Sequence, residues 1–488
     1  MTPLHALLIP AAGAVLIGLL GRRPNLREGA TFLTAGALLA AVIALVVAYV
    51  QGEAPRWEGP PLPIGPAGLG LRLAFELEPL GVVYALVAAV LWLPNSLYSV
   101  GYMRGHHEQH QTRFYVCFAL ALASVMGIAF AGNLFTLFVF YEALSIVTFP
   151  LVTHHESPES VRAGRIYVGF LFGTSMLFLL LAIVGTWALT EPHTVTFVEG
   201  GILGDVPPLY QGALFALFML GIGKAALMPF HFWLPAAMVA PTPVSALLHA
   251  VAVVKAGVFC VLKVAVYVFG LDLVGSDATG DWLMFLSSAT ILIASLVALY
   301  QDNLKARLAY STVSQLSYIV LGASLGSAAG IVGGGLHIVM HAFGKITLFF
   351  AAGAIYVATG KTRVSELTGL GREMPITFLA FGVGALSIIG LPPFGGAWSK
   401  WYLGLGTLAS DHPWLIGVLL VSSLLNVAYL LPIPIRAFLL REEGERERGF
   451  REAPWPCVVA LTITALASIA LFFAPEPLVA LLQEVVTP

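Results

Sequence analysis

The sequence predicts an all-α polytopic membrane protein, and three observations lead to that fold class. Hydrophobic residues make up 58% of the 488 residues and charged residues only 10%, whereas soluble globular proteins carry about 25% charged residues. The mean hydropathy is +0.90. Apolar runs of about 20 residues, the length that crosses a bilayer as a helix, recur along the whole chain.

About fourteen transmembrane helices are expected, separated by polar connections that contain glycine or proline. The connections are too short for a separate soluble domain, so we expect one membrane domain over 1–488. The expected spans are 4–20, 30–50, 79–102, 113–131, 133–153, 166–189, 209–228, 244–270, 282–300, 308–325, 330–358, 376–404, 414–438 and 455–482.

The basic residues predict the orientation, because Lys and Arg are enriched in short cytoplasmic loops. Of the 24 Lys and Arg residues, only Arg56 and Arg72 fall on one face of this topology. Seventeen fall on the other face: Arg22, Arg23, Arg27, Arg104, Arg113, Arg162, Arg165, Lys305, Arg307, Lys361, Arg363, Arg372, Arg436, Arg441, Arg446, Arg448 and Arg451. We therefore expect a multi-pass protein of the cell inner (plasma) membrane with both termini non-cytoplasmic. The first arginines follow the first apolar run, which favours a spanning helix over a cleaved signal.

Five lysines remain inside or at the edge of apolar spans. A charge at the centre of a spanning helix costs about 2.5–3.5 kcal/mol, so such residues usually face the bundle interior and mark an ion pathway. For Lys263, reaching out to the membrane interface is an equally good explanation. The five are Lys224, Lys255, Lys263, Lys345 and Lys400.

One acid, Glu142, lies deep in a span, with Lys224 as its expected partner. A purely structural ion pair between them remains an alternative. One carboxylate cannot neutralise the other deep lysines, so some of these are expected to be neutral part of the time and able to carry a proton. The three cysteines have no metal-binding or redox spacing, and we expect no metal site and no cofactor.

Three histidines accompany the lysines. His249 precedes Lys255, and His337 and His341 share nearly one helix face with Lys345, at positions i, i+4 and i+8. Imidazole takes up and passes on a proton near neutral pH. A buried histidine that bonds a backbone carbonyl in the core is the alternative for each of them.

Two predicted spans contain helix breakers at membrane depth. Prolines 229, 235, 241 and 243 follow Lys224, and SIIGLPPFGGAWSKW places Pro392 and Pro393 before Lys400. Proline removes a backbone donor and clashes with the preceding turn, and in lipid the freed carbonyls need partners from protein or water. Interrupted spans at corresponding places of two halves indicate a transport site.

Several long motifs, in order from about residue 75 to 440, resemble the antiporter-like subunit family. They are Glu142, KAALMPFHFWLPAAMVAPTPVSALLHA, DNLKARLAYSTVSQLSY, HAFGKITLFF and GLPPFGGAWSKWY. The family includes the A-type and D-type subunits of Mrp-type Na⁺/H⁺ antiporters, the large membrane subunits of respiratory complex I and subunits of energy-converting hydrogenases. The resemblance implies fourteen helices with two inverted five-helix repeats and broken helices 7 and 12. The implied parts are helices 1–3 in 1–111, the repeats in 112–270 and 282–440, and helix 14 in 455–488.

The resemblance also implies roles for individual residues. Glu142 and Lys224 match the family's glutamate and partner lysine, Lys255 with His249 matches the central relay lysine, and Lys400 matches the outlet. His337, His341 and Lys345 match the polar stretch of helix 11. The expected function is proton conduction along this Glu/Lys/His relay.

The branch within the family is expected to be the D-type subunit of an Mrp antiporter. HAFGKITLFFAAGAIY and SKWYLG resemble that branch, and Lys400 replaces the glutamate usual in the middle complex I subunit. The chain leaves no space after 455–482 for the C-terminal extensions that the distal complex I subunit shares with the A-type Mrp subunit. A complex I or hydrogenase subunit is the alternative. Expected partners are the lipid bilayer, other membrane subunits of the same complex, H⁺ and, in this chain or a partner, Na⁺; no nucleic acid is expected.

Two other classes of protein fit the sequence less well. A membrane enzyme would need a nucleophile, metal ligands or a cofactor fingerprint, and the sequence offers none. Within this chain we therefore expect ion transport without chemistry. A structural scaffold would tolerate apolar replacement of the buried lysines.

Overall fold

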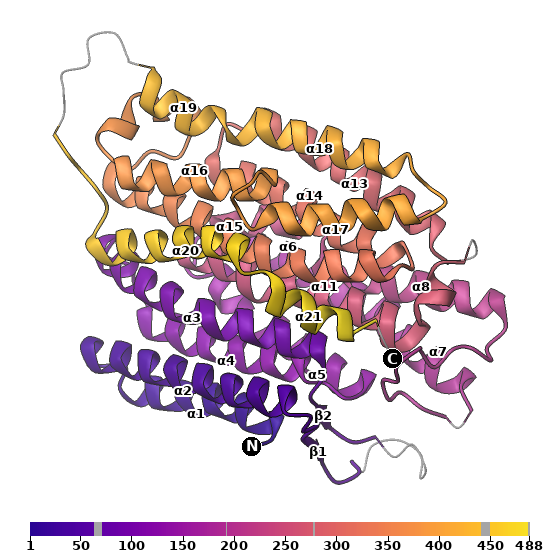
Figure 1. Ribbon diagram of the computed structural model, residues 1–488. Helices are drawn as coiled ribbons and strands as arrows, with labels where there is room; N and C mark the ends of the chain where they lie inside the picture. The colour runs from indigo at the N-terminus through magenta and orange to yellow at the C-terminus, as the bar shows by residue number, and fades with distance from the viewer. Residues whose placement is uncertain (63–70, 192, 277–278, 441–448, 487–488) are drawn as a thin grey trace.

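The computed structural model describes residues 1–62, 71–191, 193–276, 279–440 and 449–486. They form a bundle whose helices run nearly side by side, with indigo α1 and α2 at one edge and orange α18 and α19 at the opposite edge (Figure 1). The long helices up to the middle of the chain are α1 (Pro3–Leu19), α2 (Pro24–Val50), α3 (Pro79–Gly105), α4 (Gln111–Ala129), α5 (Leu134–Val152), α6 (Pro158–Thr174), α7 (Leu180–Leu189), α8 (Pro208–Gly221), α11 (Val253–Val264) and α13 (Asp281–Tyr300).

The second half of the chain adds further helices of the same kind. They are α14 (Leu304–Ser324), α15 (Ala328–Thr359), α16 (Pro375–Ile389), α17 (Gly396–Ala409), α18 (Leu415–Leu430), α19 (Pro432–Leu439), α20 (Trp455–Phe473) and α21 (Glu476–Glu484). Short turns of helix complete the chain: α9 (Trp233–Ala236), α10 (Thr242–Ala246), α12 (Leu271–Val274), η1 (Ser175–Leu179), η2 (Gly223–Ala225), η3 (Ala237–Val239), η4 (Leu247–Val251), η5 (Ala265–Phe269), η6 (Val364–Leu367) and η7 (Leu370–Arg372).

The helices confirm a polytopic membrane protein. Within the described residues, ten helices are long and apolar enough to cross a membrane, and three shorter apolar helices, α1, α8 and α16, accompany them. The predicted span 308–325 corresponds to α14, a more polar helix outside that set. The exact number of fourteen spans and the inverted repeats remain predictions.

Both proline-rich segments interrupt their helices, as expected from the lost backbone donors. The first interruption follows Gly221, where α8 ends, and Pro229 lies in the turn beyond η2. The second separates Ile389, the end of α16, from Gly396, the start of α17. The chain returns so tightly there that a Cβ on Gly396 would lie 1.8 Å from the carbonyl oxygen of Ser387.

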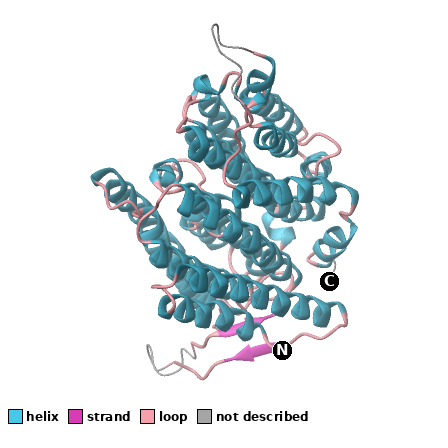
Figure 2. Cartoon of the chain, turned by 90° about the vertical axis from the view of Figure 1, so that its left-hand side faces the viewer, coloured by secondary structure: helices cyan, strands magenta, loops and turns pink. Residues whose placement is uncertain are grey.

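Strands occur only as one small hairpin in the described part of the chain. β1 (Arg56–Glu58) pairs antiparallel with β2 (Ala74–Glu76). The hairpin lies at the same end of the bundle as the two chain termini (Figures 1 and 2), and Phe75 of β2 packs against Phe140 of α5. The opposite end carries the α1–α2 connection with Arg22 and Arg23 and the end of α3 with Arg104, and we call it the basic end (Figure 1).

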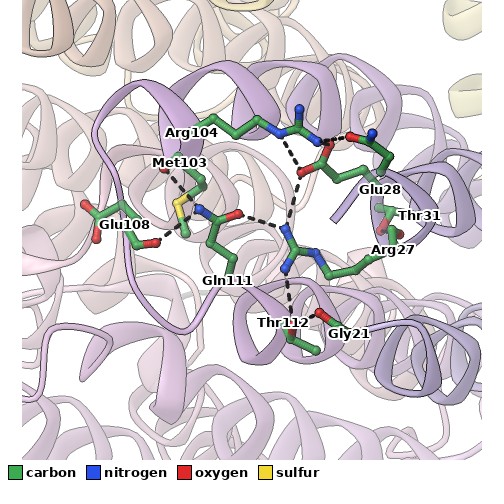
Figure 3. Close-up of polar contacts among 10 residues, drawn as sticks. Gly21, Arg27, Glu28, Thr31, Met103, Arg104, Glu108, Gln111 and Thr112 are labelled. Carbon is green, nitrogen blue, oxygen red and sulfur yellow. Dashed lines mark hydrogen bonds and ion pairs between the residues drawn. The ribbon is translucent and has the colours of Figure 1, made fainter. Parts of the chain in front are cut away.

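An ionic cluster at the basic end joins α2 to α3 and α4. Glu28 accepts hydrogen bonds from Arg104 at 3.0 and 2.5 Å and from Arg27 at 3.3 Å. Arg27 also donates to Gln111 at 2.8 Å and Thr112 at 3.2 Å (Figure 3). The sequence assigned Arg27 to a loop, but α2 begins at Pro24, so Arg27 and Glu28 are buried helical residues.

Candidate functional site

The two most buried spans carry most of the predicted relay. The apolar windows of Thr242–Phe269 and Ala328–Thr359 are 100% buried inside the protein, whereas the other candidate spans are 33% to 78% buried. The first contains His249 and Lys255, and the second contains His337, His341 and Lys345. All five side chains are at most 2% exposed. These polar groups therefore face protein and avoid the lipid.

Lys255 and His341 meet between these two spans. The Nζ atom of Lys255 on α11 forms a hydrogen bond with Nδ1 of His341 on α15. No carboxylate joins this pair within ion-pair distance among the described residues. An amine and an imidazole can share one proton in either direction, because each nitrogen is a donor when protonated and an acceptor when not. Lys255 thus has a partner able to take its proton.

A line of side chains continues from His341 toward Lys400. The rings of His341 and His337 lie 5.6 Å apart, and Nδ1 of His337 hydrogen-bonds Oγ of Ser399 at 2.9 Å. The ring of Tyr318 stacks on His337 at 5.6 Å and lies 5.0 Å from Nζ of Lys400. The structure thus brings Lys255, His341 and His337 of α15, and Lys400 into one continuous row of polar side chains, which we call the polar file.

Lys224 lies in the unwound turn after α8 and contacts α5. Its Nζ donates to the carbonyl oxygen of Tyr141 at 2.8 Å and to Oγ of Ser145 at 2.7 Å, and it lies 3.2 Å from the centroid of the Tyr141 ring. This approach requires Gly257, because a Cβ there would lie 2.2 Å from the backbone carbon of Lys224. The glycine packs α11 against the turn.

The expected direct ion pair between Glu142 and Lys224 is absent from the structure. No oxygen of Glu142 lies within 4.0 Å of a cationic nitrogen of the described residues, and its carboxyl group lies near the side chain of Ser175, which can donate a hydrogen bond to it. The reason is local: on α5 the adjacent Tyr141 carbonyl and Ser145 already hold the ammonium group. Glu142 and Lys224 still interact electrostatically at longer range.

Three of the deep lysines share one kind of environment. Like Lys224, Lys345 donates to a carbonyl oxygen (Leu308, 3.2 Å) and a serine hydroxyl (Ser311, 2.6 Å). Lys400 does the same with Ile389 at 2.9 Å and Ser423 at 3.0 Å. Neutral acceptors hold each ammonium group in place without cancelling its charge. Lys345 bonds α14 through these two acceptors, and no hydrogen bond between described side chains joins it to Lys255 or to the histidines.

Several buried ring nitrogens in this region have no hydrogen-bond partner among the described residues. They are both nitrogens of His249 and Nε2 of His337 and His341. Buried polar atoms are normally paired with protein or ordered water. These atoms therefore mark positions where water would complete the file. No hydrogen bond between described side chains joins Lys224 to Lys255 or His249 to Lys255.

Lys263 stands apart from the relay lysines. It is 1% exposed and forms an ion pair of 2.7 Å with Glu78, and it also donates to the carbonyl oxygen of Ala131 at 2.7 Å. The sequence left open that it reaches out to the membrane interface. Its ammonium group pairs with a carboxylate at the start of α3, next to β2 at the end of the bundle, beside a cavity of about 570 Å³ that Glu76 and Glu199 also line.

Some residues of the site were missed in the sequence. Lys305 was assigned to a loop, but it lies in the first turn of α14 and donates to the carbonyl oxygen of Ala240 at 2.5 Å. Asn303 caps that helix by accepting from the N–H of Ala306 at 3.0 Å. This cap, an asparagine before an apolar pattern, is a helix-start signal that would have placed Lys305 in the bundle.

Side chains that could ligate a metal are not clustered in the described part of the chain. No group of three or more His, Cys, Asp or Glu side chains there is arranged to hold a metal ion. The three cysteines are free, and Cys260 and Cys457 are buried. The assembled site consists of amines, imidazoles and one carboxyl group, and what these groups can do is bind and release protons.

Comparison with known proteins places this arrangement in a family. Residues 131–426 match the family model described as NADH:quinone oxidoreductase/Mrp antiporter, TM. The chain is 33% identical over 497 residues to NADH-quinone oxidoreductase subunit N of Desulforudis audaxviator (strain MP104C), with 98% of this chain and 96% of that protein covered.

A further relative and a solved structure support the same family. A Na(+)/H(+) antiporter subunit of Alkalihalophilus pseudofirmus (strain ATCC BAA-2126 / JCM 17055 / OF4) is 33% identical over 356 residues, which cover 68% of this chain and 42% of that protein. A chain of the Mrp complex from Dietzia sp. DQ12-45-1b has the same fold, with a TM-score of 0.83, 22% identity and coverage of 99% of this chain and 96% of that one. The resemblance drawn from the motifs is confirmed: this chain belongs to the NADH:quinone oxidoreductase/Mrp antiporter family of membrane proteins.

Proposed function

We propose that the chain is the proton-translocating subunit of a multisubunit membrane complex. Protons enter through Glu142 and Lys224, cross by Lys255 and the histidines, and leave near Lys400. The observation that carries this proposal is the hydrogen bond of Lys255 with His341, a lysine in the most buried part of the protein whose partner is a base and not a carboxylate.

The neutral environments of the lysines support proton transfer over fixed charge. A lysine locked against a carboxylate would lose an ion pair on deprotonation, whereas one held by carbonyl and hydroxyl oxygens loses only hydrogen bonds. Lys224 and Lys400 are both of the second kind. Their similar settings, each beside an interrupted helix, are also what two related repeats would produce.

Glu142 acts on the relay through its charge. Its carboxyl oxygens are buried, with the hydroxyl of Ser175 and, at longer range, the ammonium group of Lys224 acting on them, so the group can approach Lys224 or hold a proton itself. When Glu142 approaches Lys224, their charges compensate; when they separate, the uncompensated ammonium repels a proton from Lys255. Changes in this distance would couple the chain to its neighbours in the complex.

Water completes the file where side chains leave gaps. Lys224 and Lys255 are not bridged by a side chain, and the ring nitrogens of His249 lack partners. Proton transfer between these groups therefore requires hydration, which the interrupted helices admit because their freed carbonyls can bind water.

Within the family, the D-type subunit of an Mrp-type Na⁺/H⁺ antiporter is the narrower proposal. It rests on the segments HAFGKITLFFAAGAIY and SKWYLG and on Lys400. A second candidate is a membrane subunit of complex I or of an energy-converting hydrogenase. The 33% identity to a quinone oxidoreductase subunit over 98% of this chain favours it. In either complex the chain would lie in the plasma membrane with its basic end in the cytoplasm, and its partners would be other membrane subunits.

Replacing Lys255 by methionine tests the relay. The matched control is Arg165→Met, which removes an exposed cation from α6. In membrane vesicles containing the assembled complex, Lys255→Met should abolish proton translocation, measured with a pH-sensitive dye, while Arg165→Met should preserve it. Full translocation by Lys255→Met would favour the structural-scaffold alternative and defeat the proposal.

A further inference from the structure

A cluster of histidines surrounds one glutamate at the basic end of the bundle, outside the spans. Glu108 lies in the turn between α3 and α4. Its Oε1 is 3.1 Å from Nδ1 of His106, and its Oε2 is 3.6 Å from Nδ1 of His155 and 3.9 Å from Nε2 of His154. His110 and Glu156 lie beside them, 3.9 Å apart. The relay described above uses none of these residues.

The turn that carries Glu108 is fixed in position. Gln111 donates from one amide nitrogen to the carbonyl oxygens of Met103 at 3.2 Å and Glu108 at 3.1 Å. Its own oxygen accepts from Arg27 of the ionic cluster (Figure 3). The glutamate is therefore held beside α5 by a network that reaches α2 and α3.

Part of this cluster lines a cavity that leads inward. The cavity has a volume of about 210 Å³, and its wall includes the exposed His106 and His155, the half-buried Glu108 and Lys305, and the buried Thr242. Lys305 bonds the carbonyl oxygen of Ala240, directly before the α10–η4 segment that carries His249. It interacts electrostatically with both Glu108 and His249. The cavity thus lies between the outer histidines and the start of the relay span.

We propose that Glu108, His106 and His155 form a proton-collecting site that delivers protons from the aqueous phase through this cavity to Lys305 and on to His249. The inference rests on the proposed proton-translocating function and adds an uptake point to it. A carboxylate beside imidazoles attracts protons, and both kinds of group can bind and release them. The ligand is H⁺ itself, carried by water or by a small buffer acid.

Two neighbours in the cluster are unsuited to this exchange. Burial and the nearby charge of Arg113 lower the pKa of His154 to about 4, so its ring stays neutral near pH 7. A hydrogen bond from Arg113 holds the pKa of the exposed Glu156 below its usual value, so that carboxylate stays charged. Neither residue lines the cavity.

Other charged groups lie around the proposed site on the neighbouring elements. They are Arg27 and Glu28 of α2, Arg104 of α3, His110 and Arg113 at α4, His154 and Glu156 after α5, Lys305 of α14 and Lys361 after α15.

The test compares a cavity variant with a matched variant outside the cavity. We would measure proton uptake from the basic end against pH, in weakly buffered vesicles containing the assembled complex. Glu108→Gln combined with His155→Gln should slow uptake at pH 8 by about tenfold, the low end of what electrostatic focusing adds to association rates. At pH 6, where protons are abundant, uptake should match the unmodified protein. His110→Gln combined with Glu156→Gln should leave the profile unchanged.

Added imidazole separates proton delivery from structural damage. A small mobile buffer bypasses a collecting site, so imidazole should restore the rate of the Glu108/His155 variant at pH 8. It should not restore Lys305→Met, where the inner acceptor is lost. An unchanged pH profile for the Glu108/His155 variant would overturn the proposal, as would an equal loss at all pH values that imidazole does not repair.

The result for Lys255→Met keeps the two proposals apart. If Lys255→Met translocates protons normally, the relay itself is wrong. If it abolishes translocation while the Glu108/His155 variant keeps the unmodified pH profile, the relay stands and only the collecting site fails.

Discussion

Nζ of Lys255 and Nδ1 of His341 are hydrogen-bonded to each other across the interface of α11 and α15, the two helices that pass through the most buried part of the protein. The residues are 86 positions apart in the sequence. Their contact supplies a base for the proton of a lysine that has no carboxylate partner, and the main predictions follow from it.

Lys255→Arg should fail as completely as Lys255→Ala. A guanidinium group keeps the positive charge but is effectively never deprotonated, so it cannot hand a proton to His341. Proton translocation in vesicles and the amount of assembled complex would be measured together. Normal translocation by the arginine variant would show that fixed charge is sufficient.

Glu142→Gln should abolish translocation while the complex still assembles. The substitution preserves shape, removes the charge that acts on Lys224 and leaves an amide oxygen that can still accept a hydrogen bond from Ser175. Assembly would be followed by native gel electrophoresis and translocation by a pH-sensitive dye. Glu159→Gln, at the start of α6, is the control. Wild-type translocation by the Glu142 variant would remove this residue from the pathway.

Water is expected at the interrupted helix that contains Pro392 and Pro393, because the freed carbonyls need partners. Met340 reports on this site, since its sulfur lies 2.6 Å from where a Cβ on Gly395 would be. It is 1% exposed, and Met126 in the uninterrupted α4 is 0% exposed. Hydroxyl-radical labelling read by mass spectrometry should therefore oxidise Met340 and spare Met126. Equal protection of both would indicate a dry interruption.

Gly257→Ala should destabilise the complex by about 1–3 kcal/mol, the usual cost of overpacking. The added Cβ would lie 2.2 Å from the backbone of Lys224, and backbone cannot move aside as a flexible side chain can. Thermal unfolding in detergent would measure the loss. Gly382→Ala in α16 is the matched control, because no atom lies within 4 Å of its Cβ position. A Gly257 variant as stable as that control would contradict the close packing.

The sequence predicted those parts of the site whose free-energy cost in the membrane depends on the residue itself and not on its neighbours. A lysine in an apolar run and a proline at membrane depth both cost free energy wherever the helix packs. Lys255, Lys400 and both interruptions could therefore be predicted without a structure. Partners were harder to predict. The ion pair of Glu142 with Lys224 was expected from charge alone, but a carbonyl and Ser145 compete for the same ammonium group and hold it.

The residues that the sequence did not predict were missed for a different reason. Serines are common in helices, so nothing singled out Ser311 or Ser423 as lysine acceptors before the helices were packed. Lys305 and Arg27 were taken for loop residues because the apolar runs begin after them. Both helices in fact start earlier, at Leu304 and Pro24, and their first turns are polar. Hydropathy marks the lipid-crossing part of a helix, not its full length.

The position of α20 has a consequence for how the chain is made. This helix follows all the relay helices in the sequence, yet it packs against α3 and α15, and Cys457 fills the space that Gly101 leaves open. During synthesis, α15 with its histidines and lysine must enter the bilayer before the helix that covers it exists. Until α20 is translated, the faces of α3 and α15 that it covers are open to lipid or to the insertion machinery, and a ribosome stalled before residue 455 would leave the bundle open.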